Sequence, residues 1–198
     1  MSSPAPYDVL HFCRETHTTV LALVDSLDDA QLRWRPAGYS TSVGFHAWHL
    51  ARETDFLVSA ILQRVPQLGL DFGEAQELWA RDGLAGRWGF PAEASETVGT
   101  GLSDEVAAAL PLPPKAELLD YLRRAYARLE VFVEQLDTRY ARTEAAADEL
   151  RPRLANIRLN VLVFLAHDCR HLGMMECLKG LQTGFGSATE QRPAKAAA

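Results

Sequence analysis

The sequence predicts an all-α protein, a four-helix bundle with a long connection between helices 2 and 3. Four long segments place apolar residues three or four positions apart, which is the spacing of an amphipathic helix. No segment shows the sustained alternation of apolar and polar residues that predicts a half-buried strand. The chain has 198 residues, of which 47% are hydrophobic, so it can bury one sizeable core.

The first two helices are predicted on apolar spacing and on their end signals. The first covers residues 6 to 26, and a short polar turn at Asp28-Asp29 follows it. The second runs from residue 43 to 64. Ser42 is a suitable N-cap for that helix, and Pro66 marks its end, because proline cannot continue a helix.

The connection from residue 66 to 114 holds many of the glycines and prolines of the chain. A connection of this length rarely lacks structure inside a compact domain. We expect a short helix around Phe72–Arg81 and a loop beyond it. The sequence leaves open whether this segment covers a functional site or packs on the outside of the bundle.

The last two helices are predicted over residues 115 to 137 and 153 to 180, with a polar link through Glu144–Asp148 between them. Gly180 is the expected stop of the final helix, since glycine favours helix ends. The apolar stripe of that helix turns polar near its middle, at Asp168, and then becomes apolar again. A polar group on a stripe that should be buried is costly unless it has a partner.

Residues 1–186 are predicted to form one domain, and residues 187–198, which are small and polar, to form a disordered tail. The formal net charge is −6 and the basic residues are scattered, so we expect no nucleic-acid partner. The longest apolar stretch, near residues 160–166, is far shorter than the ~20 residues that span a bilayer. No secretory signal is visible either, so no membrane association is expected.

The three cysteines, Cys13, Cys169 and Cys177, form no C-x-x-C pair and leave one cysteine over. This pattern favours a reducing compartment over a disulfide scaffold, and we therefore expect a cytoplasmic protein. Each cysteine is predicted to be a small buried apolar residue.

Two histidines four residues apart are the most informative feature of the chain. His167 and His171 leave the same face of one predicted helix, roughly 5–6 Å apart at Cβ. Two such nitrogens can bind one metal ion if another helix supplies a third. His49 is the best candidate, although periodicity alone leaves open whether His46 or His49 points inward. Three imidazoles would leave a position open for water or substrate, as in catalytic sites, and would suit Zn, Ni, Fe or Cu.

Two carboxylates lie close to these histidines in sequence. Glu53 is one turn beyond His49, so it could be a fourth ligand, a general base or an acceptor that orients an imidazole. Pairing with a neighbouring arginine on the surface is an equally good interpretation of Glu53. Asp168 has the same alternatives, and as an acceptor from a ligand N–H it would fix the tautomer of that ring.

The chain resembles the DinB/YfiT-like family over most of its length. The resemblance rests on four stretches, which are Leu32-Arg33-Trp34-Arg35-Pro36, residues 42–53 around Trp48-His49, the pair His167-x-x-x-His171 with Gly173, and Leu178-Lys179-Gly180-Leu181-Gln182. It implies a four-helix bundle with a divalent metal, Zn, Ni or Fe, on His49, His167 and His171. Where many relatives have Gln or Glu after the glycine, this chain has Met174-Met175.

The resemblance also implies candidate functions. The family includes thiol-dependent transferases that use bacillithiol or mycothiol, and its members often form homodimers. Our first hypothesis is therefore a metal-dependent transferase or hydrolase, in which a metal-activated thiol or water attacks a small electrophilic substrate. In the transferase, a low-molecular-weight thiol is the cofactor. The second is a non-catalytic, metal-binding, stress-responsive dimer, and the third is a helical interaction module without metal.

Overall fold

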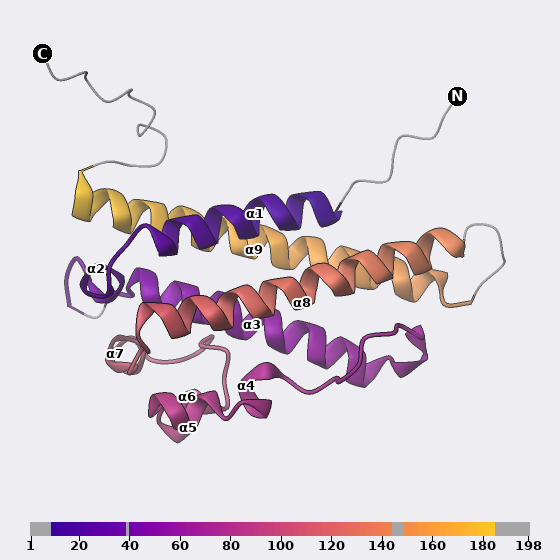
Figure 1. The fold of residues 1–198 in the computed structure, drawn as a ribbon, viewed down its shortest axis with the longest axis horizontal. Helices are drawn as coiled ribbons and strands as arrows, with labels where there is room; N and C mark the ends of the chain where they lie inside the picture. The colour runs from indigo at the N-terminus through magenta and orange to yellow at the C-terminus, as the bar shows by residue number, and fades with distance from the viewer. Residues whose placement is uncertain (1–8, 39, 144–148, 185–198) are drawn as a thin grey trace, which may run out of the picture.

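The computed structural model describes residues 9–38, 40–143 and 149–184, and within these ranges it contains helices and no strand. The all-α prediction is therefore confirmed. The four long helices are α1 (Val9–Asp25), α3 (Val43–Arg64), α8 (Lys115–Arg142) and α9 (Arg151–Thr183). They lie side by side, and α1 and α3 each pack against both α8 and α9 (Figure 1). Among the described residues, no helix combines the length and apolar character needed to cross a bilayer.

The ends of the long helices follow their local chemistry. Helix α3 has the predicted bounds, and the Ser42 hydroxyl caps it by accepting the Phe45 N–H at 3.1 Å. Helix α8 runs past the predicted end at residue 137, to Arg142. The predicted stop at Gly180 is wrong, because α9 continues until Gly184 adopts a left-handed conformation with φ +75°. A glycine inside a helix weakens it by about 1 kcal/mol but need not end it.

The turn predicted at Asp28-Asp29 is the start of a helix. Asp28 is the N-cap of α2 (Asp29–Arg33), and its carboxylate accepts the Gln31 N–H at 2.8 Å. The Gln31 side chain in turn accepts the Asp28 N–H at 2.9 Å. Two reciprocal bonds of this kind satisfy the first free N–H groups and allow a helix too short to show an apolar period.

The long connection is more helical than expected. The prediction of a helix over Phe72–Arg81 is wrong in its first part, since only α4 (Leu78–Arg81) forms there. The loop predicted beyond it contains three further short helices. They are α5 (Leu84–Trp88), α6 (Ala92–Ser95) and α7 (Asp104–Ala109), and a 3₁₀ turn, η1 (Pro66–Leu68), follows α3. Figure 1 shows α4 to α7 grouped along one side of α3 and α8.

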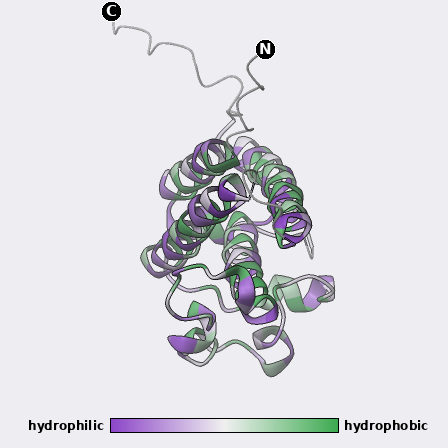
Figure 2. Ribbon diagram, turned by 90° about the vertical axis from the view of Figure 1, so that its right-hand side faces the viewer, coloured by the Kyte–Doolittle hydropathy of each residue, from purple (hydrophilic) through white to green (hydrophobic). Residues whose placement is uncertain are grey.

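The apolar faces of the helices meet inside the bundle (Figure 2). One buried cluster surrounds Trp48 and extends to the aromatic residues of the connection, including Trp79. A second cluster surrounds Phe132 near the other end of α8. The predicted polar link at 144–148 and the predicted tail at 187–198 lie outside the described residues, and the single-domain prediction remains a prediction.

A fully buried carboxylate ties the connection to the bundle. Asp55 accepts the N–H groups of Leu78 and Trp79 at 3.0 and 2.9 Å, and these are the first residues of α4. It also accepts the Tyr121 hydroxyl at 3.1 Å and an Arg128 N–H at 2.8 Å. We call Asp55 and these four donors the Asp55 cluster. It sets the start of α4 and joins that helix to α3 and α8.

The cysteine prediction is correct for one residue of three. Cys13 is buried, and burial first, followed by nearby carboxylates, raises the pKa of its thiol to about 12. Cys169 and Cys177 are exposed on α9, so the prediction that they are buried is wrong. Both residues lie outside the set of buried α9 positions, although the Cys169 sulfur still lies 3.9 Å from the Thr16 hydroxyl of α1.

Candidate metal centre

Three histidine rings from two helices converge between α3 and α9. Nε2 of His167 lies 3.3 Å from Nε2 of His49 and 3.0 Å from Nε2 of His171. One ring nitrogen from each of the three lies within 4.8 Å of the others. The structure thus brings together the three residues that the sequence singled out, and we call them the three-histidine cluster.

The spacing of these nitrogens fits a metal ion. With metal–nitrogen bonds of about 2.0–2.1 Å, two ligands on one ion are separated by about 2.9 Å in octahedral and about 3.3 Å in tetrahedral geometry. The separations of 3.0 and 3.3 Å, which His167 Nε2 makes with His171 Nε2 and His49 Nε2, lie in that range. The cluster also offers three imidazole nitrogens, a set that suits Zn, Ni or Fe.

A backbone carbonyl fixes the tautomer of His49. Nδ1 of His49 lies 2.6 Å from the carbonyl oxygen of Val98, and a carbonyl can only accept, so Nδ1 carries the proton. The lone pair of His49 is therefore on Nε2, which faces the other two rings. Burial, first of all, lowers the pKa of His49, which keeps the ring neutral.

The same backbone segment resolves the open question about the long connection. Gly99 follows Val98 with φ +104°, and a Cβ there would lie 2.9 Å from the Trp48 ring and 3.1 Å from His49 Nδ1. Thr100 donates its hydroxyl to Glu53 Oε1 at 3.0 Å. The connection therefore covers part of the site rather than only packing on the outside.

His167 is flanked by both carboxylates that the sequence proposed. Its Nδ1 lies 3.3 Å from Glu53 Oε2 and 3.8 Å from Asp168 Oδ1, without a well-aligned hydrogen bond to either. Asp168 first, and then Glu53, raise the pKa of His167. Two acceptors on this side favour a proton on Nδ1 and leave Nε2 of His167 for a ligand.

Glu53 occupies a position that suits more than one of its predicted roles. Its Oε1 is 3.8 Å from His49 Nε2, the nitrogen that faces the cluster, while its Oε2 lies beside His167. Its side chain is 15% exposed, and that of His167 is 21% exposed. The site is therefore partly exposed on the side of Glu53 and His167.

Both histidines of the His46/His49 pair point toward α9, which periodicity had left open. Nδ1 of His46 lies 2.8 Å from Nδ1 of His171, and Nε2 of His46 lies 3.1 Å from the Thr41 hydroxyl. Burial, ahead of neighbouring histidines, lowers the pKa of His46 to about 4 and that of His171 to about 3. His46 thus meets the far side of a ring whose Nε2 belongs to the cluster.

Asp168 is a buried residue of α9, and His17 of α1 and Tyr126 of α8 lie close enough to interact with it electrostatically. Burial raises the pKa of its carboxyl group. His17 from α1 stacks on Tyr126 from α8 with ring centroids 3.7 Å apart, and its Nδ1 bonds to Glu130 at 2.7 Å. His17 is buried and supplies no nitrogen to the three-histidine cluster.

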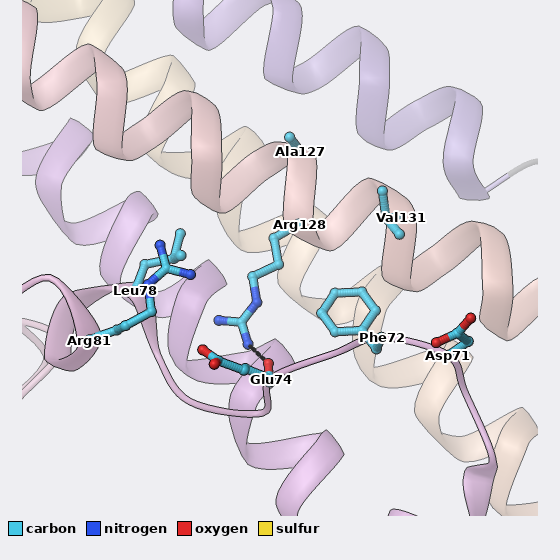
Figure 3. Close-up of a pocket in the computed structure, with 8 residues that line it drawn as sticks. All are labelled: Asp71, Phe72, Glu74, Leu78, Arg81, Ala127, Arg128 and Val131. Atoms are coloured by element: carbon cyan, nitrogen blue, oxygen red, sulfur yellow. Dashed lines mark hydrogen bonds between the residues drawn. The ribbon is translucent and has the colours of Figure 1, made fainter.

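A separate groove of about 710 Å³ lies between α8 and the segment that leads into α4 (Figure 3). Its two arginines already have partners. Arg128 donates to Asp55, to the Ser59 hydroxyl and to the Glu74 carbonyl, and Arg81 donates to its neighbour Asp82. Because both guanidinium groups already donate to acceptors of the protein, we assign no anion-binding site to this groove.

A family model described as the DinB superfamily matches residues 13–175, which is most of the chain. The chain belongs to the DinB superfamily. Among solved structures, this DinB-superfamily chain is similar to a conserved protein from Enterococcus faecalis, with a TM-score of 0.66, 17% identity, and coverage of 93% of this chain and 100% of that one. That likeness shows the shared fold, and no curated protein is significantly similar in sequence.

Proposed function

We propose that this protein is a divalent-metal-dependent enzyme that transfers a low-molecular-weight thiol to a small electrophilic substrate. The observation that carries the proposal is the convergence of three Nε2 atoms, with His167 Nε2 lying 3.0 Å from His171 Nε2 and 3.3 Å from His49 Nε2, while His49 Nδ1 bonds to the Val98 carbonyl. His49, His167 and His171 would hold the ion. Membership of the DinB superfamily supports the same ligand set.

The site supplies what such a reaction needs. A divalent ion, when bound, lowers the pKa of a coordinated thiol or water and so provides a nucleophile near neutral pH. Three protein ligands leave a position for that thiol. The thiolate sulfur would form an S–C bond with the electrophilic carbon of the substrate, and the leaving group would depart with the electron pair of the bond that breaks.

Glu53 is the residue that we assign to the thiol proton. Its Oε1 lies 3.8 Å from His49 Nε2 and accepts the Thr100 hydroxyl, which holds the carboxylate beside the cluster. Because the Glu53 side chain is partly exposed, a proton taken there can pass to solvent. Asp168 is too deeply buried for that role and is assigned to orienting His167.

The test begins with elemental analysis of protein purified without an affinity tag. The Zn²⁺-loaded protein is then incubated with cysteine, glutathione and other small thiols together with 1-chloro-2,4-dinitrobenzene, and loss of free thiol is followed. We expect turnover that disappears after chelation and in His171→Ala. Absence of metal-dependent turnover over the whole panel would count against the enzyme.

The non-catalytic alternative makes a different prediction. It requires an ion that the protein closes off completely, whereas the 21% exposure of the His167 side chain supports a site that small molecules reach. Metal uptake without turnover would favour that alternative. The substrate, the native metal and the homodimer remain predictions.

A further inference from the structure

A second histidine, His46, stands directly behind one of the three ligands that we assign. Its side chain is buried, with the residue 4% exposed, and its Nδ1 lies 2.8 Å from Nδ1 of His171. On its other edge, Nε2 lies 3.1 Å from the hydroxyl of Thr41, the residue before the α3 cap. His46 lies on the same helix as His49, three positions earlier, but it contributes no nitrogen to the three-histidine cluster.

The short distance between the two Nδ1 atoms requires that they share one proton. Two protonated nitrogens at 2.8 Å would repel each other, and two bare lone pairs would do the same. If the proton is on His171, its Nε2 is free and faces the cluster. If the proton is on His46, His171 in its neutral form carries its proton on Nε2, the atom needed for a metal bond.

We propose that His46 is a positioning residue, which accepts the Nδ1–H of His171 and so presents His171 Nε2 to the metal. Thr41 supports this arrangement by accepting the Nε2–H of His46, which leaves His46 Nδ1 free to accept. The proposal rests on the proposed function, because it assigns His171 to a metal ion.

The other two ligands support this assignment by contrast. His49 donates to the Val98 carbonyl, and His167 has Glu53 and Asp168 beside its Nδ1. His171 has neither a carbonyl nor a carboxylate within hydrogen-bond distance among the contacts of the described residues, and His46 takes that place. Metal-ligating histidines almost always donate their second nitrogen to an acceptor, and replacing the acceptor weakens metal binding by about 10- to 100-fold.

The experiment compares two variants of nearly equal shape. Asn at position 46 places its Oδ1 where Nδ1 of histidine stood and retains an acceptor, whereas Leu has the same branching without one. Zn²⁺ affinity is measured by competition with a chromophoric chelator on the full chain. We expect His46→Leu to weaken Zn²⁺ binding about 10- to 100-fold and His46→Asn to stay within about 3-fold of the original protein.

A spectroscopic readout separates positioning from packing. In ¹H–¹⁵N NMR spectra of the Zn²⁺-loaded protein, the Nδ1 proton of His171 should be protected from exchange with solvent in the original protein and in His46→Asn. In His46→Leu the same proton should exchange rapidly, and its signal should disappear. Thr41→Val leaves both rings in place and should weaken Zn²⁺ binding about 2- to 5-fold.

The outcomes are distinct for the two proposals. Failure of the original protein to bind Zn²⁺ overturns the proposed function, and the role of His46 with it. Normal Zn²⁺ binding by the original protein, with equal affinities in His46→Leu and His46→Asn, overturns only the role of His46, because a space-filling residue would not distinguish them. If His46→Leu fails to fold, an unchanged affinity in Thr41→Val overturns the proposal.

Discussion

The Asp55 cluster and the three-histidine cluster both draw on α3, and they differ in where their hydrogen bonds end. Around Asp55, every bond is donated by the protein to one carboxylate, from Leu78, Trp79, Tyr121 and Arg128. Around the histidines, bonds to protein acceptors involve the outer nitrogens, while the inner Nε2 atoms face one another. A cluster whose hydrogen bonds are all satisfied within the protein stabilises the fold. Nitrogen lone pairs that converge on one point are instead arranged to bind a ligand such as a metal ion.

The largest expected effect concerns the Asp55 cluster. Asp55→Ala should lower the free energy of unfolding by about 3–5 kcal/mol, because it leaves a largely buried arginine and three further donors without this acceptor. Urea denaturation followed by circular dichroism measures the change. Asp137→Ala is the control, since that residue pairs with Arg158 at a partly exposed site and should cost at most about 1 kcal/mol. Equal losses in the two variants would show that burial of Asp55 is not what matters.

The next largest effect concerns the three-histidine cluster. At a free Zn²⁺ concentration of about 100 times Kd, bound metal should raise the free energy of unfolding by about 2.7 kcal/mol. His49→Ala should abolish that increment, which is taken for each variant as the difference between its own Zn²⁺-loaded and metal-free stabilities. Replacement of the exposed His11 by alanine should leave the increment intact. A full Zn²⁺ increment in His49→Ala would remove that residue from the assigned ligands.

A smaller effect tests the contact between the long connection and the site. Gly99→Ala places a Cβ 2.9 Å from Trp48 and 3.1 Å from His49 Nδ1, so we expect a loss of about 1–3 kcal/mol and weaker Zn²⁺ binding. Gly101 is the matched control, with φ +88° and open space around a Cβ. Gly101→Ala has similar backbone strain and should leave Zn²⁺ affinity unchanged. If both variants bind Zn²⁺ with the original affinity, the bond from His49 Nδ1 to the Val98 carbonyl is not needed to orient His49 for the metal ion.

The smallest effect concerns pH. The pKa of His46 is lowered to about 4, mainly by burial, so below the ordinary value of about 6.5 the unfolded chain binds a proton that the folded chain does not. Its stability contribution is therefore present above pH 6.5 and is lost as the pH falls. Between pH 7.5 and 5.5, the metal-free protein should lose about 1 kcal/mol more stability than His46→Leu, as measured by urea denaturation. Asp168, whose raised pKa acts in the opposite direction, is common to both proteins and cancels. Identical losses would contradict the burial argument.

The long helices were predictable because their apolar period extends over many turns. Helix α3 was placed at residues 43 to 64 from its spacing, its Ser42 cap and Pro66. Helices α4 to α7 have four to six residues each, which is too short for an apolar period. The start of α4 is set by Asp55, more than twenty residues earlier in the chain, and no local signal reports such a contact.

The sequence predicted those parts of the candidate site that side chains form, and not the parts that the backbone forms. The spacing of His167 and His171 placed both rings on one face, and the structure brings His49 to them. The Val98 carbonyl has no side-chain signature, and Gly99 could not be told from the other glycines of the connection. The separate places of His46 and His49 follow from the helix rotation between them, which depends on how α3 meets α9.

The anchoring of α4 by Asp55 has a consequence for protein design. The same connection that Asp55 fastens also carries the Val98 carbonyl, which sets the proton on His49. Transplanting only three histidines onto another bundle would therefore reproduce the rings without their orientation. A faithful graft would have to include the segment from α4 to Thr100 and the carboxylate that fastens it.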